Sequence, residues 1–127
     1  MSGVTYDTGA LIAAERNERR MWALHAGFLT DGIIPTVPSP VLAEAWRGGA
    51  RQAHLARLLA MCEVEGLSEP LARAVGTLAG QSHHRDIVDV AVVEGALRRS
   101  DGVVTSNRDH IEAIANAVGT RLRIADV

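Results

Sequence analysis

At 127 residues, the chain is long enough for one domain with a substantial hydrophobic core and too short for two comfortable ones. Apolar residues make up 47% of it and charged residues 22%, as in ordinary globular proteins, and no apolar run approaches the length of a membrane span. The formal net charge of −2 argues against a broadly basic surface for binding nucleic acid.

Short apolar segments alternate along the chain with longer segments of helical periodicity. The predicted β-strands cover, in order, residues 4–6, 33–39, 63–67, 102–106 and 121–127. The predicted helices cover residues 8–16, 18–31, 40–47, 50–62, 69–80, 86–100 and 108–118. This alternation with short connections predicts one α/β domain over residues 1–127, with a central parallel sheet of about five strands and helices on both faces.

Individual residues predict where some helices begin. Ser39 followed by Pro40 is a typical start, with a capping residue and then proline at the first helical position. Ser68 and Asn107 precede two further helical segments and are expected to cap them.

Two features of composition bear on location and on possible ligands. The single cysteine, Cys62, lies in an apolar helical run and is expected to pack in the core; it fits a reducing compartment. The N-terminal residues show no secretory pattern, so a cytoplasmic protein without a membrane segment is expected. The chain has no lysine, and all thirteen of its basic side chains are arginines, which suit bidentate contacts to phosphate.

Acidic residues follow the predicted strands or open the helices after them: Asp7, Glu44, Asp86, Asp89 and Asp109. Each has a structural alternative, since acids cap helices, complement the helix dipole or, for Glu44, pair with an arginine one turn away. In a parallel sheet, however, they would all emerge at one edge, where ligands bind at the point at which the strand order reverses. Crowded carboxylates favour a hard divalent cation such as Mg²⁺ or Mn²⁺, which can hold a phosphodiester, help form hydroxide and stabilise the leaving oxygen.

Four segments resemble the PIN-domain family, in particular the VapC-type toxins of type II toxin–antitoxin systems: "VTYDTGALIAA", "VPSPVLAEAWR", "HHRDIVDVAVVEGA" and "GVVTSNRDHI". The resemblance covers essentially the whole chain and implies a PIN-like three-layer fold with a five-stranded parallel sheet. It also implies a Mg²⁺- or Mn²⁺-dependent endoribonuclease, an RNA substrate, a VapB-type antitoxin and a homodimer. Asp7, Glu44 and Asp89 match the family's most characteristic acids, and Asp86 is an accessory metal ligand by position.

The fourth acidic position departs from the family pattern. Many relatives have an aspartate directly after the Thr-Ser pair and often another three residues later, where this chain has Asn107 and His110. Asp109 is the nearest carboxylate, so the fourth ligand is either Asp109 or Asn107, and one or two metal ions are expected. Thr105 and Ser106 would hydrogen-bond a metal-bound water or a phosphate oxygen, or else simply end the strand.

Other side chains have alternative interpretations. His83 and His84 beside Asp86 suggest zinc, but no second histidine or cysteine cluster accompanies them, and a polar loop accounts for them better. Trp22 and Trp46 are expected to pack in the core or an interface rather than stack on bases. Arg47, one turn beyond Glu44, is the arginine expected to contact substrate or to hold that carboxylate.

The sequence also excludes rival activities. It contains no GxxxxGK[ST] loop, no lysine for a phospho-receiver domain and no Gly-x-Gly-x-x-Gly after the first strand. The hypothesis is therefore an endoribonuclease toxin that uses Asp7, Glu44, Asp89 and Asp109. The alternatives are a catalytically inactive PIN-fold module that binds RNA or protein, and a housekeeping RNA-processing nuclease.

Overall fold

A computed structural model describes residues 3–127. Five parallel strands form one sheet in the order β3-β2-β1-β4-β5. The strands are β1 (Gly3–Tyr6), β2 (Thr36–Pro38), β3 (Glu63–Glu65), β4 (Asp101–Thr105) and β5 (Ile124–Asp126). All five predicted strands are present, although most are shorter than the apolar segments that predicted them.

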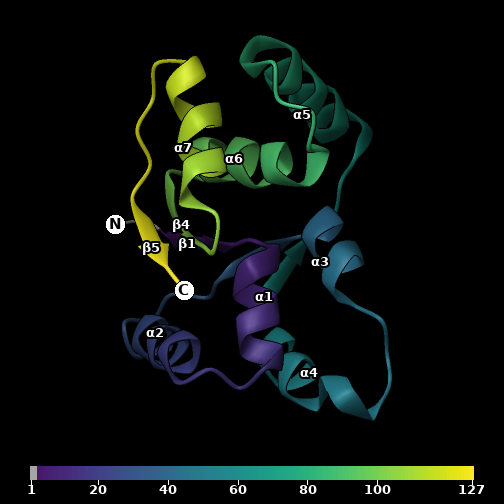
Figure 1. The fold of residues 1–127 in the computed structure, drawn as a ribbon, viewed down its shortest axis with the longest axis vertical. Helices are drawn as coiled ribbons and strands as arrows, with labels where there is room; N and C mark the ends of the chain where they lie inside the picture. Colours follow the sequence, from purple (N-terminus) through teal and green to yellow (C-terminus); the bar gives the residue numbers. More distant parts are fainter. Residues whose placement is uncertain (1–2) are drawn as a thin grey trace.

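Seven α-helices cover the sheet within residues 3–127, and a short 3₁₀ turn, Ala50–Gln52, precedes the fourth. They are α1 (Thr8–Glu15), α2 (Arg19–Thr30), α3 (Ser39–Ala45), α4 (Ala53–Leu59), α5 (Glu69–Ser82), α6 (Ile87–Arg99) and α7 (Arg108–Ala117). Helices α5, α6 and α7 lie on one side of the sheet and α1, α2 and α4 on the other, which gives three layers (Figure 1). The predicted α/β fold class is confirmed, and none of the helices in the described part is long and apolar enough to cross a membrane.

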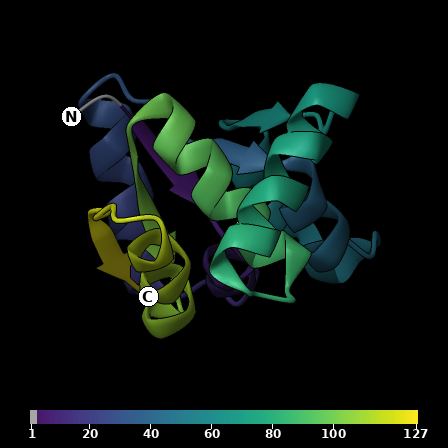
Figure 2. The same ribbon diagram turned by 90° about the horizontal axis from the view of Figure 1, so that it is seen from above.

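Buried side chains from both helical layers meet the sheet. Tyr6, Leu11, Met21, Leu55 and Ile111 are among the largest side chains that are fully buried. Helix α6 runs across the sheet between α5 and α7, as Figure 2 shows, and its Val90, Val92 and Val93 are inaccessible to solvent. Burial at about 25 cal/mol per Å² of apolar surface makes this core the main source of stability.

The predicted helix start at Ser39 is wrong by one position. Pro38 is the N-cap residue of α3, and Ser39 is already helical. The Ser39 hydroxyl accepts a hydrogen bond from the backbone N–H of Leu67 (3.1 Å) and so ties α3 to the segment after β3. The start at Ser68 is confirmed, because its side chain accepts from the N–H of Leu71.

The two tryptophans differ in environment. Trp22 is partly buried against the core; its indole N–H donates to the carbonyl of Ala14 (3.2 Å), and the guanidinium of Arg57 lies 4.3 Å from its ring centre. Trp46 is 42% exposed, so packing in the core of this domain does not account for it. Cys62 packs against the core, and burial raises the pKa of its thiol to about 12, which makes it a poor nucleophile.

A buried histidine gives the fold a pH dependence. His25 is 1% exposed; its Nδ1 lies 2.8 Å from the hydroxyl of Tyr6, and its Nε2 has no hydrogen-bond partner among the described residues. Burial raises the pKa of Tyr6 above its usual range, so the phenol beside Nδ1 stays neutral. Burial also lowers the pKa of His25, and the native protein therefore holds this ring uncharged.

We expect His25 to make the protein less stable in mild acid. The unfolded chain binds a proton at His25 below pH about 6.5, whereas the native state resists it, so stability falls as the pH drops below that value. His25→Gln should flatten the fall in melting temperature between pH 7.5 and 5.5, as measured by circular dichroism. The same change at the partly exposed His54 should leave the slope unchanged; equal slopes in all three proteins would contradict the assignment.

Candidate metal centre

The candidate site lies where the strand order reverses. The chain adds β2 and β3 on one side of β1, and later β4 and β5 on the other, so the reversal falls between β1 and β4. The residues that follow these two neighbouring strands are Asp7 and the segment from Ser106 onwards. Ligands of parallel α/β sheets bind in this position, beyond the carboxyl ends of the strands.

Asp7 is a buried carboxylate directly after β1. It is the N-cap residue of α1: its Oδ1 accepts from the N–H of Ala10 (2.9 Å), and its own N–H donates to the carbonyl of Val104 (3.2 Å). Its exposed fraction is only 4%. Burial raises the pKa of Asp7, the side chain of Thr105 lowers it by hydrogen bonding, and the charge of Asp89 raises it again. The predicted capping role is therefore confirmed.

Asp89 meets two histidines. It lies in the first turn of α6, and its Oδ2 is 3.5 Å from Nε2 of His84 and 3.3 Å from Nδ1 of His110. Its pKa is raised by burial and by the charge of Asp86 and is lowered by hydrogen bonds with the two histidines. The ligand atoms of His84, Asp89 and His110 all lie within 4.8 Å of one another.

Asp86 caps the same helix. Its Oδ1 accepts from the N–H groups of Val88 (3.0 Å) and Asp89 (3.3 Å), which fixes the first turn of α6 and with it the place of Asp89. The side chain is exposed. The capping alternative is thus confirmed for Asp86, and one of its carboxylate oxygens is already occupied.

The end of β4 and the segment after it contribute further polar side chains to the candidate site. Thr105 is fully buried, and its hydroxyl accepts from the N–H of Asn107 (2.8 Å) while its side chain hydrogen-bonds Asp7. Asn107 is the N-cap residue of α7, but its side chain makes no capping bond; its Nδ2 lies 2.8 Å from Nδ1 of His110 instead. The predicted side-chain cap at Asn107 is absent, because the Asn107 amide contacts the imidazole of His110 instead of a backbone N–H of α7.

Of the predicted acidic ligands, only Asp89 belongs to the group of ligand atoms that converge in the described residues; Asp7, Glu44, Asp86 and Asp109 lie outside it. Glu44 is exposed on α3, a helix that packs against α1 and α6, and Asp109 is exposed in the first turn of α7. Arg47 is exposed and donates through Nη1 to the carbonyls of Ala43 (3.2 Å) and Trp46 (2.7 Å), so its guanidinium binds the end of α3.

His84 and His110 are the site residues that the sequence left unassigned. His84 was weighed with His83 and Asp86, but its partners are Asp89 and a histidine from a distant helix. The available signal was the position of His110, three residues after Asn107, where the PIN-domain pattern often has an aspartate. A histidine at this position can still bind a metal, because imidazole nitrogen is a common metal ligand.

Two solved structures resemble the chain over nearly its full length. One is a crystal structure of VapBC2 from Rickettsia felis bound to a DNA fragment from its promoter, with a TM-score of 0.74, 17% identity and 98% of each chain covered. The other is a structure of FitAB bound to an IR36 DNA fragment, with a TM-score of 0.63, 15% identity, and 97% of this chain and 94% of the other covered. The chain has a PIN-like fold. Neither a protein-family model nor a curated protein sequence matches it.

The donor set around this point fits a divalent cation. Asp7 and Asp89 supply carboxylate oxygens, which hard cations such as Mg²⁺ and Mn²⁺ prefer, and a cation between them would offset their mutual repulsion. The imidazoles of His84 and His110 add nitrogen donors that Mg²⁺ uses little and that Mn²⁺, Co²⁺ and Zn²⁺ accept.

A glycine permits the close approach of α1 to the segment after β4. A Cβ on Gly9 would lie 2.6 Å from Cβ and 3.0 Å from the backbone nitrogen of Ser106. Such distances are shorter than real Cβ contacts, and the backbone atom cannot move aside cheaply. Glycine at this position therefore lets Asp7 and Thr105 share one site.

Gly9→Ala should lower the melting temperature and weaken metal binding together, because the new methyl group pushes α1 away from Ser106. We expect a loss of about 1–3 kcal/mol in unfolding free energy, as for other overpacked positions. Gly27→Ala, on the open surface of α2, is the matched control and should cost nothing or stabilise the helix slightly. Chemical denaturation and a metal titration would measure both effects; a Gly9→Ala protein that matches the Gly27→Ala protein would contradict the prediction.

Proposed function

We propose that the chain is a metal-dependent endoribonuclease and the toxin of a VapBC-type toxin–antitoxin pair. The observation that supports this most strongly is the buried carboxylate of Asp7, directly after β1 at the reversal point of a PIN-like sheet. Proteins named as VapBC2 and FitAB share the fold. Asp7, Glu44, Asp89 and Asp109 are the proposed catalytic and metal residues, with Asp86 accessory.

A bound Mg²⁺ or Mn²⁺ would supply positive charge for the phosphodiester, lower the pKa of a water molecule and stabilise the departing oxygen. The protein's own contribution is to hold the ligands. Thr105 orients the carboxylate of Asp7, and Asp86 fixes the first turn of α6 that carries Asp89. Glu44 and Asp109 lie on flanking helices with exposed carboxylates, and in this proposal they complete the site when RNA and metal bind.

The proposed substrate is RNA, with Thr105, Ser106, Asn107 and Arg47 as candidate contacts to phosphate or water. A hollow of about 330 Å³ beside Ser106 is also lined by Gly9, Ile12 and Arg16. Arg16, exposed at the end of α1, lines this hollow together with the acidic Glu18, and its guanidinium is the candidate basic contact for a phosphate there. In this proposal the hollow is the path by which the phosphate backbone of RNA approaches the site.

The proposed partner is a VapB-type antitoxin. A hollow of about 720 Å³ lies on α2, where Ala23, Leu24 and Phe28 form an apolar floor. Two arginines, Arg19 and Arg20, and one acid, Asp31, also line it. Apolar side chains flanked by arginines suit an amphipathic segment with acidic residues. A homodimer and a cytoplasmic location complete the proposal.

RNA cleavage with and without divalent metal tests the proposed function. Purified protein should cleave a structured RNA in Mn²⁺ or Mg²⁺ and stop when EDTA is added. The product of the neighbouring small reading frame should co-purify with the chain and inhibit it. Cleavage that is unaffected by EDTA, or no cleavage with any divalent metal, would overturn the nuclease proposal.

Asn107 favours one second candidate, a catalytically inactive PIN-fold module that binds RNA or protein. An amide stands where the family pattern often has a carboxylate, and its side chain contacts His110. Such a module would bind RNA or a partner with normal affinity and show no metal-dependent cleavage. The same metal titration therefore separates the two candidates.

A further inference from the structure

Two histidines meet Asp89 from different parts of the chain. His84 lies in the loop between α5 and α6, and His110 lies in the first turn of α7. Their ring centres are 5.4 Å apart and their planes are inclined by 70°. Because both rings point to one carboxylate oxygen, three chain segments converge on a single position.

Two distances within this group, those from Asp89 to each histidine, are close to the distances between ligands of one metal ion. Donor atoms bound at about 2.0–2.1 Å around a tetrahedral zinc lie roughly 3.3 Å from one another. In this structure Oδ2 of Asp89 is 3.3 Å from Nδ1 of His110 and 3.5 Å from Nε2 of His84. The three donor atoms need only small side-chain movements to share an ion.

The surroundings give an ion access and hold the ligands in place. His110 is exposed and the side chain of His84 is 19% exposed, so an ion can enter from solvent. Asp86 fixes the backbone of Asp89 through its capping bond. The amide of Asn107 contacts the same ring nitrogen of His110, and metal binding at that nitrogen replaces this hydrogen bond.

We propose that His84, Asp89 and His110 form a mixed imidazole–carboxylate site that selects a divalent transition metal, such as Mn²⁺, Co²⁺ or Zn²⁺, over Mg²⁺. Imidazole nitrogen binds these metals well and Mg²⁺ poorly, and affinity rises along the series from Mn²⁺ to Co²⁺. This inference rests on the proposed function in one respect, the assumption that the bound metal belongs to the catalytic site. It specifies which metals this chain binds and which side chains determine that selectivity.

Direct binding of the metals alone tests the site without any cleavage assay. Zn²⁺ and Mg²⁺ affinities are measured by calorimetry or chelator competition, and the visible absorption of bound Co²⁺ reports nitrogen ligands. His84→Gln and His110→Gln should each weaken Zn²⁺ binding at least tenfold, change the Co²⁺ spectrum and leave Mg²⁺ affinity within about twofold, since removing even second-shell partners costs tenfold or more. Circular dichroism confirms that both variants are folded.

His83→Asn is the matched control. His83 is exposed, adjoins His84 in sequence and has a positive φ of 54°, which asparagine tolerates. It should bind Zn²⁺ like the wild type. Zn²⁺ affinity and Co²⁺ spectra that are unchanged in folded His84→Gln and His110→Gln proteins would overturn the inference, even if RNA is cleaved with Mg²⁺. Histidine-dependent Zn²⁺ binding without RNA cleavage would instead support the inference and overturn only the nuclease.

Discussion

Asp7→Asn should reduce metal-dependent RNA cleavage by at least about a hundredfold, because loss of even a second-shell group around a metal commonly costs ten- to a hundredfold. The fold should survive. Asparagine caps helices as well as aspartate does, so it can still accept from the N–H of Ala10, and the backbone bond to Val104 is unaffected. Initial cleavage rates over a range of Mn²⁺ concentrations, with melting temperatures beside them, measure both effects.

The stability of this variant separates a metal ligand from a structural residue. Burial raises the pKa of Asp7, so the native fold is penalised for carrying this charge at neutral pH, and a neutral amide removes the penalty. The melting temperature of Asp7→Asn in the absence of metal should equal or exceed that of the wild type. Asp31→Asn, the same change at an exposed turn residue, should alter neither property. An Asp7→Asn protein with full activity would exclude the proposed mechanism.

The parallel sheet could be predicted because local signals agree with the fold. Asp7, Ser68 and Asp86 stand directly before helices and cap them as expected, and the alternation of apolar and helical segments gives the strand count. The prediction that Ser39 caps α3 was wrong because its hydroxyl accepts from the backbone N–H of Leu67, a tertiary partner that no local pattern reveals. The boundaries of the predicted strands fail for the same reason, since strand length depends on the neighbour in the sheet.

The candidate metal centre could be predicted only in part. The parallel sheet, which the sequence indicates, places Asp7 at the carboxyl end of β1, whereas the place of Asp89 also depends on how α6 packs after α5. The inclusion of His84 and His110 depends on how the α5–α6 loop and α7 pack over α6, and that packing is a tertiary property. The contact between Asn107 and His110 is local, since three positions separate the two residues, but the general preference of asparagine for capping the backbone does not indicate it.

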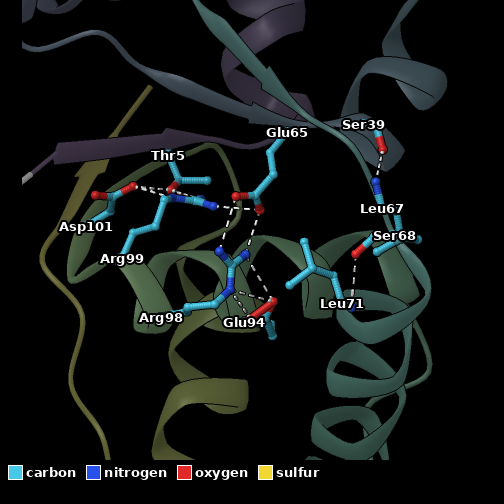
Figure 3. Close-up of polar contacts among 10 residues, drawn as sticks. All are labelled: Thr5, Ser39, Glu65, Leu67, Ser68, Leu71, Glu94, Arg98, Arg99 and Asp101. Carbon is cyan, nitrogen blue, oxygen red and sulfur yellow. Dashed lines mark hydrogen bonds and ion pairs between the residues drawn. The ribbon is translucent and has the colours of Figure 1, made fainter.

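Arg98 and Arg99, which lie outside the candidate site, also make tertiary contacts that the sequence does not predict. At the end of a helix they suggest simple complements to the dipole. In the structure, shown in Figure 3, the guanidinium of Arg98 bridges Glu65 and Glu94, and Arg99 joins α6 to three strands. The sequence gives no indication of Glu65 and Thr5 as partners, because they lie more than thirty positions away from these arginines.

Arg99→Met should be among the most destabilising changes in the protein. Arg99 donates to Asp101 (3.0 Å), Glu65 (2.8 Å) and the hydroxyl of Thr5 (2.8 Å), and its side chain is 19% exposed. Asp101 is 7% exposed and Thr5 is fully buried. Thr5 still donates to Asp101 (2.9 Å) when Arg99 is removed, but the buried carboxylate of Asp101 loses its positively charged partner. Breaking such a pair from one side costs about 3–5 kcal/mol. Chemical denaturation should show this loss.

A matched control and a double variant decide whether pairing is the cause. Arg73 makes an exposed ion pair with Glu69 one turn away, and Arg73→Met should cost less than about 1 kcal/mol. Adding Asp101→Asn to Arg99→Met should recover part of the lost stability, because it removes the uncompensated charge that the single change leaves behind. If Arg99→Met costs no more than Arg73→Met, or if the double variant is simply additive, the network in Figure 3 is not what joins α6 to the sheet.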